Sequence, residues 1–347
     1  MKKVNKNAVL MNLMKGRTFF VLLILVIFFA VKSPAFLTAS SIISVMRHVA
    51  LYGILGIGMT YVIITGGIDL SVGSVVGLTG MIAGGLIFQG LTILPLGITI
   101  YFNVPTIVLI SLALGAFVGL INGFIITKFD VAPFIATLGM MNVARGLAML
   151  RSNGATYQNI AGYEELGNTG FNSIGGSIGI IPNVVIIFAV IAAIASMILK
   201  FTPLGWHIFS VGGNANASRL SGVKVQKVTT LVYMFSGVCA AIVGLVTSAQ
   251  LTAANPSSGD GWEMNAISAV VLGGTSMSGG VGTIGGTIIG AFVIGVINDG
   301  MIMIGVSEFW QKVIKGIIIV LAVIIDQFQA KLHARMALMQ QSEEINA

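Results

Sequence analysis

The sequence predicts an all-α fold, a polytopic membrane bundle of about ten transmembrane helices. Of the 347 residues, 56% are hydrophobic and 8% are charged, and the mean hydropathy is +1.00. An ordinary soluble domain has about 25% charged residues. The 18 Lys and Arg and the 11 Asp and Glu of this chain could not cover a soluble surface without leaving large apolar patches exposed. The composition therefore excludes a soluble enzyme, a nucleic-acid-binding protein and a disordered chain.

Apolar stretches separated by polar breaks give the expected spans. Because a span needs about 20 apolar residues, the chain has enough for roughly eight to ten. The segment 91–101 is too short to span and contains Pro95, so we expect it to be re-entrant or interfacial. The ten expected spans are 18–37, 49–66, 70–88, 105–127, 132–150, 181–200, 228–248, 264–280, 283–304 and 310–326.

The distribution of basic residues sets the expected orientation. With the N-terminus in the cytoplasm, twelve Lys and Arg fall on the cytoplasmic side and five on the outer side, as the positive-inside rule requires. Both termini are then cytoplasmic, with tails 1–17 and 327–347 flanking a membrane domain 18–326. A long cytoplasmic loop covers 201–227. The outer loops carry the acidic residues Glu164, Glu165, Asp260, Glu263 and Glu308.

A weak internal repeat links two of these spans. The stretch 115–123 resembles the stretch 290–300, with two residues inserted in the second copy. The expected topology runs the two copies in opposite directions, which is typical of the inverted repeats of transporters. Chance similarity between two helices rich in Gly, Ala and Ile is the alternative.

The chain has no pattern that predicts catalysis, a metal site or a cofactor. Its three histidines, His48, His207 and His333, are far apart and have no acidic residue at ligand spacing. Zinc-protease, Cys-x-x-Cys and P-loop motifs are all missing from the sequence. We therefore expect no catalytic residue in this chain, and energy for transport would have to come from a partner protein.

Few ionisable residues fall inside the expected spans. Arg145 and Asp299 do, Asp69 stands directly before the third span, and all three lie near span ends, whereas ion-coupled carriers place such groups near the midplane. The segment 66–74 predicts a helix break and a new helix start. Gly67 would allow the turn, and Asp69 would accept hydrogen bonds from free amides of the first helical turn, with Ser71 at the start of the new helix.

The cytoplasmic loop contains a predicted short helix over 215–221. Asn214 is expected to cap its start and Gly222 to end it. A helix of small residues with the single cation Arg219 suits docking into a groove of another protein. An ordinary surface helix is the alternative.

Five signatures give the chain a resemblance to a known family. It resembles permease subunits of the bacterial ribose-type ABC sugar importers from about residue 34 to residue 326. Galactose-type permeases share the signatures, so ribose is a preference among monosaccharides. The signatures are Gly-Ile-Asp-Leu-Ser-Val-Gly at 67–73, Pro-Phe-Ile-Ala-Thr-Leu-Gly at 133–139 with Arg145-Gly146, Gly-Gly-Asn at 212–214 through Ser-Gly-Val at 221–223, Ala-Val-Val-Leu-Gly-Gly-Thr-Ser at 269–276, and Gly279-Gly280 followed by Gly290-Ala291.

The resemblance implies a ten-span permease of the bacterial inner membrane. It would pair with a second permease copy and two cytoplasmic ATP-binding subunits, and an extracytoplasmic sugar-binding protein would deliver the solute. The loop 201–227 would contact the ATPase, through Asn214, Ala217, Ser218, Arg219 and Gly222.

The translocation path is expected between the two copies. We expect it to be lined by weakly polar residues, among them Asn122, Thr137 and Asn142. Two other functions stay open at this point: an ion-coupled carrier of small solutes and an ABC permease for branched-chain amino acids.

Overall fold

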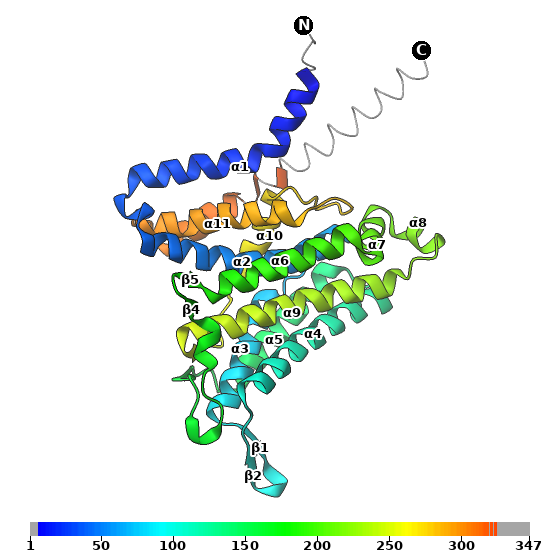
Figure 1. Ribbon diagram of the computed structural model, residues 1–347. Helices are drawn as coiled ribbons and strands as arrows, with labels where there is room; N and C mark the ends of the chain where they lie inside the picture. Colours follow the sequence, from blue (N-terminus) through cyan, green and yellow to red (C-terminus); the bar gives the residue numbers. More distant parts are fainter. Residues whose placement is uncertain (1–5, 319, 322, 325–347) are drawn as a thin grey trace.

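A computed structural model of the chain describes residues 6–318, 320–321 and 323–324 (Figure 1). It is a helical bundle with short strand pairs in its connections. The helices are α1 (Lys6–Lys32), α2 (Ala39–Ile64), α3 (Val72–Phe88), α4 (Val104–Lys128), α5 (Pro133–Leu150), α6 (Asn183–Phe201), α7 (Pro203–Gly213), α8 (Ala215–Leu220), α9 (Val225–Leu251), α10 (Trp262–Leu272) and α11 (Ile284–Met303). The strands are β1 (Leu91–Ile93), β2 (Ile98–Ile100), β3 (Tyr157–Gln158), β4 (Ser177–Ile178), β5 (Ile181–Pro182) and β6 (Ala253–Ala254).

The helical membrane bundle expected from the sequence is confirmed. Within the described part of the chain, six helices are long and apolar enough to cross a membrane, namely α2, α4, α5, α6, α9 and α11. Each corresponds to one expected span. Shorter apolar helices, 18–32 within α1 and the whole of α3, stand at the first and third expected spans. The tenth expected span, 310–326, lies partly outside the described residues.

The prediction of an unbroken span over 264–280 is wrong. α10 is only 11 residues long and ends at Leu272, and the segment 273–283 that follows it is not helical. The helix breaks here because Gly274, Gly279 and Gly280 take positive φ angles that a helix does not allow. The count of ten spans and the side of the membrane on which the termini lie stay predictions.

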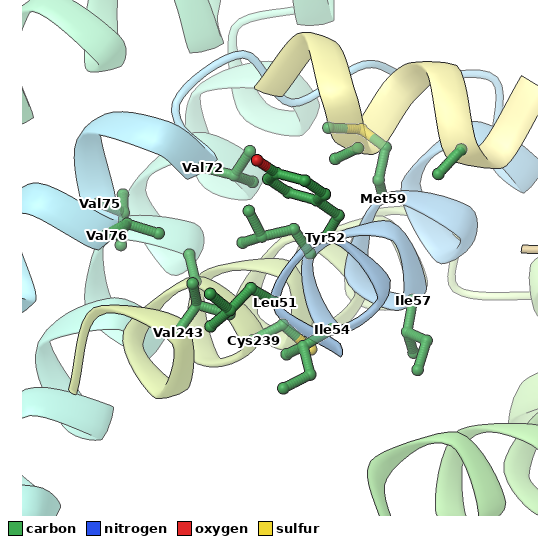
Figure 2. Packing of buried hydrophobic residues seen from close by; sticks show 14 of the residues in the cluster. Leu51, Tyr52, Ile54, Ile57, Met59, Val72, Val75, Val76, Cys239 and Val243 are labelled. Carbon is green, nitrogen blue, oxygen red and sulfur yellow. The ribbon is translucent and has the colours of Figure 1, made fainter. Parts of the chain in front are cut away.

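The core of the bundle is formed by α2, α3 and α9. Every residue of α2 from Val49 to Ile64 is buried, and so are all but two of the 17 residues of α3. Helices that are apolar around their whole circumference belong in the interior of a large bundle. Figure 2 shows this packing, with side chains of α2 beside those of α3 and α9.

Glycines let the backbones of α4 and α9 come into direct contact. A Cβ built on Gly119 would collide with the carbonyl oxygen of Tyr233, and one built on Gly237 would collide with that of Gly115. Small residues serve the same purpose in membrane helix pairs generally. The opposite side of α4 exposes Phe117, which suits contact with lipid.

The segment 91–101 forms a β-hairpin. Strands β1 and β2 pair antiparallel, with Thr92 opposite Thr99, and their residues are largely exposed. The hairpin projects from the bundle beyond the end of α3 (Figure 1). Its placement relative to the membrane, re-entrant or interfacial, stays a prediction.

Candidate functional site

The loop 201–227 folds into two short helices at one end of the bundle (Figure 1). α7 begins with Thr202, whose hydroxyl oxygen accepts a hydrogen bond from the amide of Gly205 at 3.3 Å. α8 begins with Asn214, whose Oδ1 accepts a hydrogen bond from the amide of Ala217 at 2.9 Å. Gly222 follows α8 with a φ of +88°. The sequence prediction of a capped short helix ended by glycine is thus confirmed for this segment.

The outer surface of α8 presents an apolar tip among cations. Leu220 is 90% exposed, and Ala217 and Arg219 beside it are exposed as well. Lys224 and Lys227 are also exposed, and the loop 201–227 contains no Asp or Glu. Such a surface fits a partner groove that offers an apolar pocket with an acidic rim. Sequence analysis overlooked Leu220, although a large apolar residue just before the helix-ending glycine was a visible signal.

Ser218 has a different role from its neighbours on α8. It is buried, and its hydroxyl lies 2.7 Å from that of Ser210 on α7. This hydrogen bond joins the two short helices.

The end of α7 meets two other chain segments without any intervening side chain. The amide of Gly280 donates a hydrogen bond to the carbonyl oxygen of Ile64, the last residue of α2, at 2.8 Å. A Cβ on Gly212 would collide with that same carbonyl oxygen and would lie 2.6 Å from the nitrogen of Gly280. A Cβ on Gly279 would lie 2.8 Å from the carbonyl oxygen of Gly212. We call this contact of Ile64, Gly212 and 279–280 the glycine junction.

The helix break expected at 66–74 lies directly after the glycine junction. α2 ends at Ile64 and α3 starts at Val72. Within the break, Oδ1 of Asp69 accepts hydrogen bonds from the amide of Ser71 at 3.0 Å and from its hydroxyl at 2.6 Å. Oδ2 of Asp69 accepts one from the hydroxyl of Ser236 on α9 at 2.8 Å. Ser71 occupies the N-cap position of α3, and Asp69, 1% exposed, ties the break to α9.

Two of the three expected path residues belong to this buried network. Nδ2 of Asn122 on α4 donates a hydrogen bond to the hydroxyl of Ser71 at 3.0 Å. The hydroxyl of Thr137 on α5 donates one to the carbonyl oxygen of Ile68 at 3.2 Å. Both side chains are fully buried, so contact with a solute would require the network to open. Asn142 is exposed, and its Nδ2 donates to the carbonyl oxygen of Leu138 on the same helix.

The contacts form a continuous route from α8 to the bundle interior. Only four residues lie between Ile64 in the glycine junction and Asp69 in the buried network. The junction is held by backbone atoms and the network by hydrogen bonds, so neither can absorb a displacement by rotating a loose side chain.

Comparison with known proteins places the chain in a family. The sequence model described as the permease component of branched-chain amino acid transport systems matches residues 41–323. The chain belongs to this permease family. No solved structure matches it.

Sugar import permeases are among the relatives of this permease. It is 39% identical over 315 residues to the ribose import permease protein of Escherichia coli K12, covering 90% of this chain and 94% of the relative. It is 38% identical to the ribose import permease protein of Bacillus subtilis, covering 88% and 90%. The galactose/methyl galactoside import permease protein of Haemophilus influenzae is 34% identical, covering 95% and 98%. As a member of this family with six helices long enough to span among its described residues, the permease resides in the cytoplasmic (inner) membrane.

One further residue of the permease holds a structural position that sequence analysis left without a role. Nη1 of Arg145 on α5 donates hydrogen bonds to the carbonyl oxygens of Pro256 at 2.5 Å and Ser258 at 2.9 Å. Its Nη2 donates to the carbonyl oxygen of Gly73 at 3.4 Å. Since 256–258 is far from α5 in the sequence, this contact could be found only in three dimensions.

Proposed function

We propose that this permease is the membrane subunit of an ATP-driven importer of a monosaccharide, with ribose as the preferred solute. The observation that carries the proposal is the similarity over about nine-tenths of the chain to proteins named for ribose import. Relatives named for galactose and xylose import support a sugar more generally. ATP hydrolysis is assigned to a separate cytoplasmic subunit, because the sequence has no P-loop.

The exposed tip of α8 is the proposed contact with that ATP-hydrolysing subunit. Leu220 would enter an apolar pocket of the subunit, and Arg219 and Lys224 would face acidic groups at its rim. Asn214 and Gly222 would fix the two ends of the docking helix. The small side chain of Ala217 would permit close approach of the partner surface.

Movement of α8 would then bias the bundle between two arrangements. ATP binding and release by the partner can shift the permease only if the partner binds the two arrangements with different affinities. The route through Ser218, Gly212 and Ile64 to Asp69 supplies a physical connection for that shift. The permease itself would make and break no covalent bond.

The proposed assembly follows the expected topology. We infer a membrane domain over 18–326, cytoplasmic tails at 1–17 and 327–347, and ten spans. A second permease copy, two ATP-binding subunits and an extracytoplasmic sugar-binding protein complete the importer. Lipid surrounds it, and the exposed apolar face of α4 supports that contact.

A branched-chain amino acid is the second candidate solute. The description of the matching family model favours it, whereas the names of the relatives at 37–39% identity favour ribose.

Reconstitution with purified partners separates the candidate functions. The complete importer in proteoliposomes should hydrolyse ATP faster, and accumulate labelled solute, when ribose and its binding protein are supplied. Stimulation by leucine with its own binding protein instead would favour the second solute. Uptake driven by an ion gradient without the ATPase would contradict an ATP-driven importer.

A further inference from the structure

The part of the chain that passes through the membrane between α9 and the end of α10 is helical over only part of its length. α9 ends at Leu251, and α10 begins at Trp262. Between them, β6 pairs with β3 of the loop 151–182, and the residues 255–261 form turns instead of a helix. The expectation that Asp260 and Glu263 lie in an ordinary outer loop therefore needs correction.

The irregular segment follows α3 deep into the bundle. A Cβ on Gly84 would lie 2.6 Å from the Cβ of Ala254, and one on Gly73 would touch the carbonyl oxygen of Gly259. At 1.5 Å per residue, the stretch of α3 between these two contacts is about 16 Å long. That is about half the 30 Å thickness of the hydrocarbon core. The segment thus carries non-helical backbone to the middle of the membrane.

One side of this segment is held against the protein. Arg145 donates hydrogen bonds to the carbonyl oxygens of Pro256 and Ser258, as described above. Gly77 leaves room for this guanidinium, since a Cβ there would lie 2.6 Å from its Nη1. Towards α3 and α5, the backbone carbonyls of the segment therefore have their partners.

The other side of the segment is open. Asn255, Ser257 and Asp260 are exposed, and Oδ1 of Asn255 accepts a hydrogen bond only from the amide of Ser257 within the same turn. Non-helical backbone at membrane depth does not face lipid, because lipid offers no hydrogen bonds. It is tolerated where it is buried in protein or lines a water-filled cavity.

A polar and aromatic cluster adjoins the open side at Trp262. The Trp262 ring stands edge-on to Tyr52 with ring centroids 5.6 Å apart, and His48 stacks on Tyr52 at 6.2 Å. Nδ1 of His48 lies 2.7 Å from Oδ1 of Asp299. Oδ2 of Asp299 is buried and has no hydrogen-bond partner among the described residues, and water commonly fills that role for buried polar atoms.

We propose that the open face formed by Asn255, Ser257, Asp260 and Trp262 lines the water-filled path of the transported solute, with a second permease copy as the opposite wall. This inference rests on the proposed function. The face offers a carboxylate, an amide, a hydroxyl and an aromatic ring, and it presents no cation. It suits a neutral, hydroxyl-rich solute and disfavours an anion. Asn142, three residues before Arg145 on α5, is the expected path residue that stays exposed.

Thiol labelling tests the proposal in the complete importer. The single cysteine, Cys239, is buried and is replaced by Cys239→Ala, after which Ser257→Cys or Asp260→Cys is introduced. A charged, membrane-impermeant methanethiosulfonate should modify either cysteine at least about tenfold faster than Phe117→Cys, because the reactive thiolate forms in water and not in lipid. Phe117 is a matched control, since it is 55% exposed on the apolar side of α4. Modification at position 257 should also block uptake.

Two results would overturn the proposal. Cysteines at 257 and 260 that react only with a lipid-soluble maleimide would place the open face in lipid. Cysteines that react with neither reagent would place it in a dry protein interface. Normal solute-dependent uptake by the Cys239→Ala importer without a further substitution shows that the proposed function holds while this inference fails. Absence of solute-dependent uptake in the unsubstituted importer would instead count against the proposed function, and the labelling would still report exposure.

Discussion

The substitution Gly212→Ala tests the glycine junction with a single methyl group. A Cβ at this position collides with the carbonyl oxygen of Ile64 and approaches the amide nitrogen of Gly280 to 2.6 Å. Both obstacles are backbone atoms, so α7 or α2 must shift. Overpacking of a tight contact costs about 1–3 kcal/mol. If that cost falls on the arrangement seen here, the equilibrium constant between the two arrangements of the permease changes by about 5-fold to 150-fold, because 1.4 kcal/mol corresponds to a factor of ten.

Gly213→Ala is the matched control for this substitution. Gly213 follows Gly212 in the last turn of α7, and a Cβ there has nothing within 4 Å. Both substitutions stabilise the helix by about 1 kcal/mol through helix propensity. The difference between the effects of the two variants therefore reports the contact at the glycine junction. The assay is the ratio of solute-stimulated to basal ATP hydrolysis in the purified importer, in which differences in expression cancel. We expect a lower or lost stimulation for Gly212→Ala and a normal ratio for Gly213→Ala. Equal, wild-type ratios for both variants would refute the role of the junction.

Three further predictions follow from the docking helix, the buried network and the topology. Ala217→Glu and Gly222→Glu should abolish uptake and stimulated ATP hydrolysis while the permease stays in the membrane, because a bulky anion blocks close approach of the partner; normal uptake would remove docking from α8. Asp69→Ala should lower the free energy of unfolding by about 1–3 kcal/mol, since Ser71 and Ser236 lose their acceptor; an unchanged melting temperature in detergent would contradict this. A reporter after Ala347 should be cytoplasmic and one near Glu164 outside, and fusions that fall on the same side would show that the number of spans between them is wrong.

Local chemistry explains why some of the site could be predicted from the sequence. The cap of α8 depends on Asn214 and on the amide three residues later, and its end depends on the positive φ of Gly222. Both requirements involve only residues of the nine-residue segment 214–222. Long apolar stretches likewise predicted α4, α6 and α9, since a span is set by length and hydropathy alone.

Tertiary contacts decided what the sequence could not reveal. The segment 273–283 carries no charged residue that would mark the end of a span, but its glycines turn the chain into the glycine junction. Asn122 and Thr137 have the polarity expected of path residues, but their partners Ser71 and Ile68 come from a distant helix break. The same holds for Arg145, whose three carbonyl acceptors are separated from it by 72 to 113 positions.

The most direct test of the account is to find which protein contacts the tip of α8. A photo-cross-linking amino acid at Leu220, which is 90% exposed, should form a covalent product with the ATP-hydrolysing subunit in the intact importer. The same amino acid at Ile180, which is 82% exposed beside β5 at the opposite end of the bundle, should not react with that subunit. A product between Ile180 and the ATP-hydrolysing subunit, with none at Leu220, would contradict both the docking surface and the orientation derived from the basic residues.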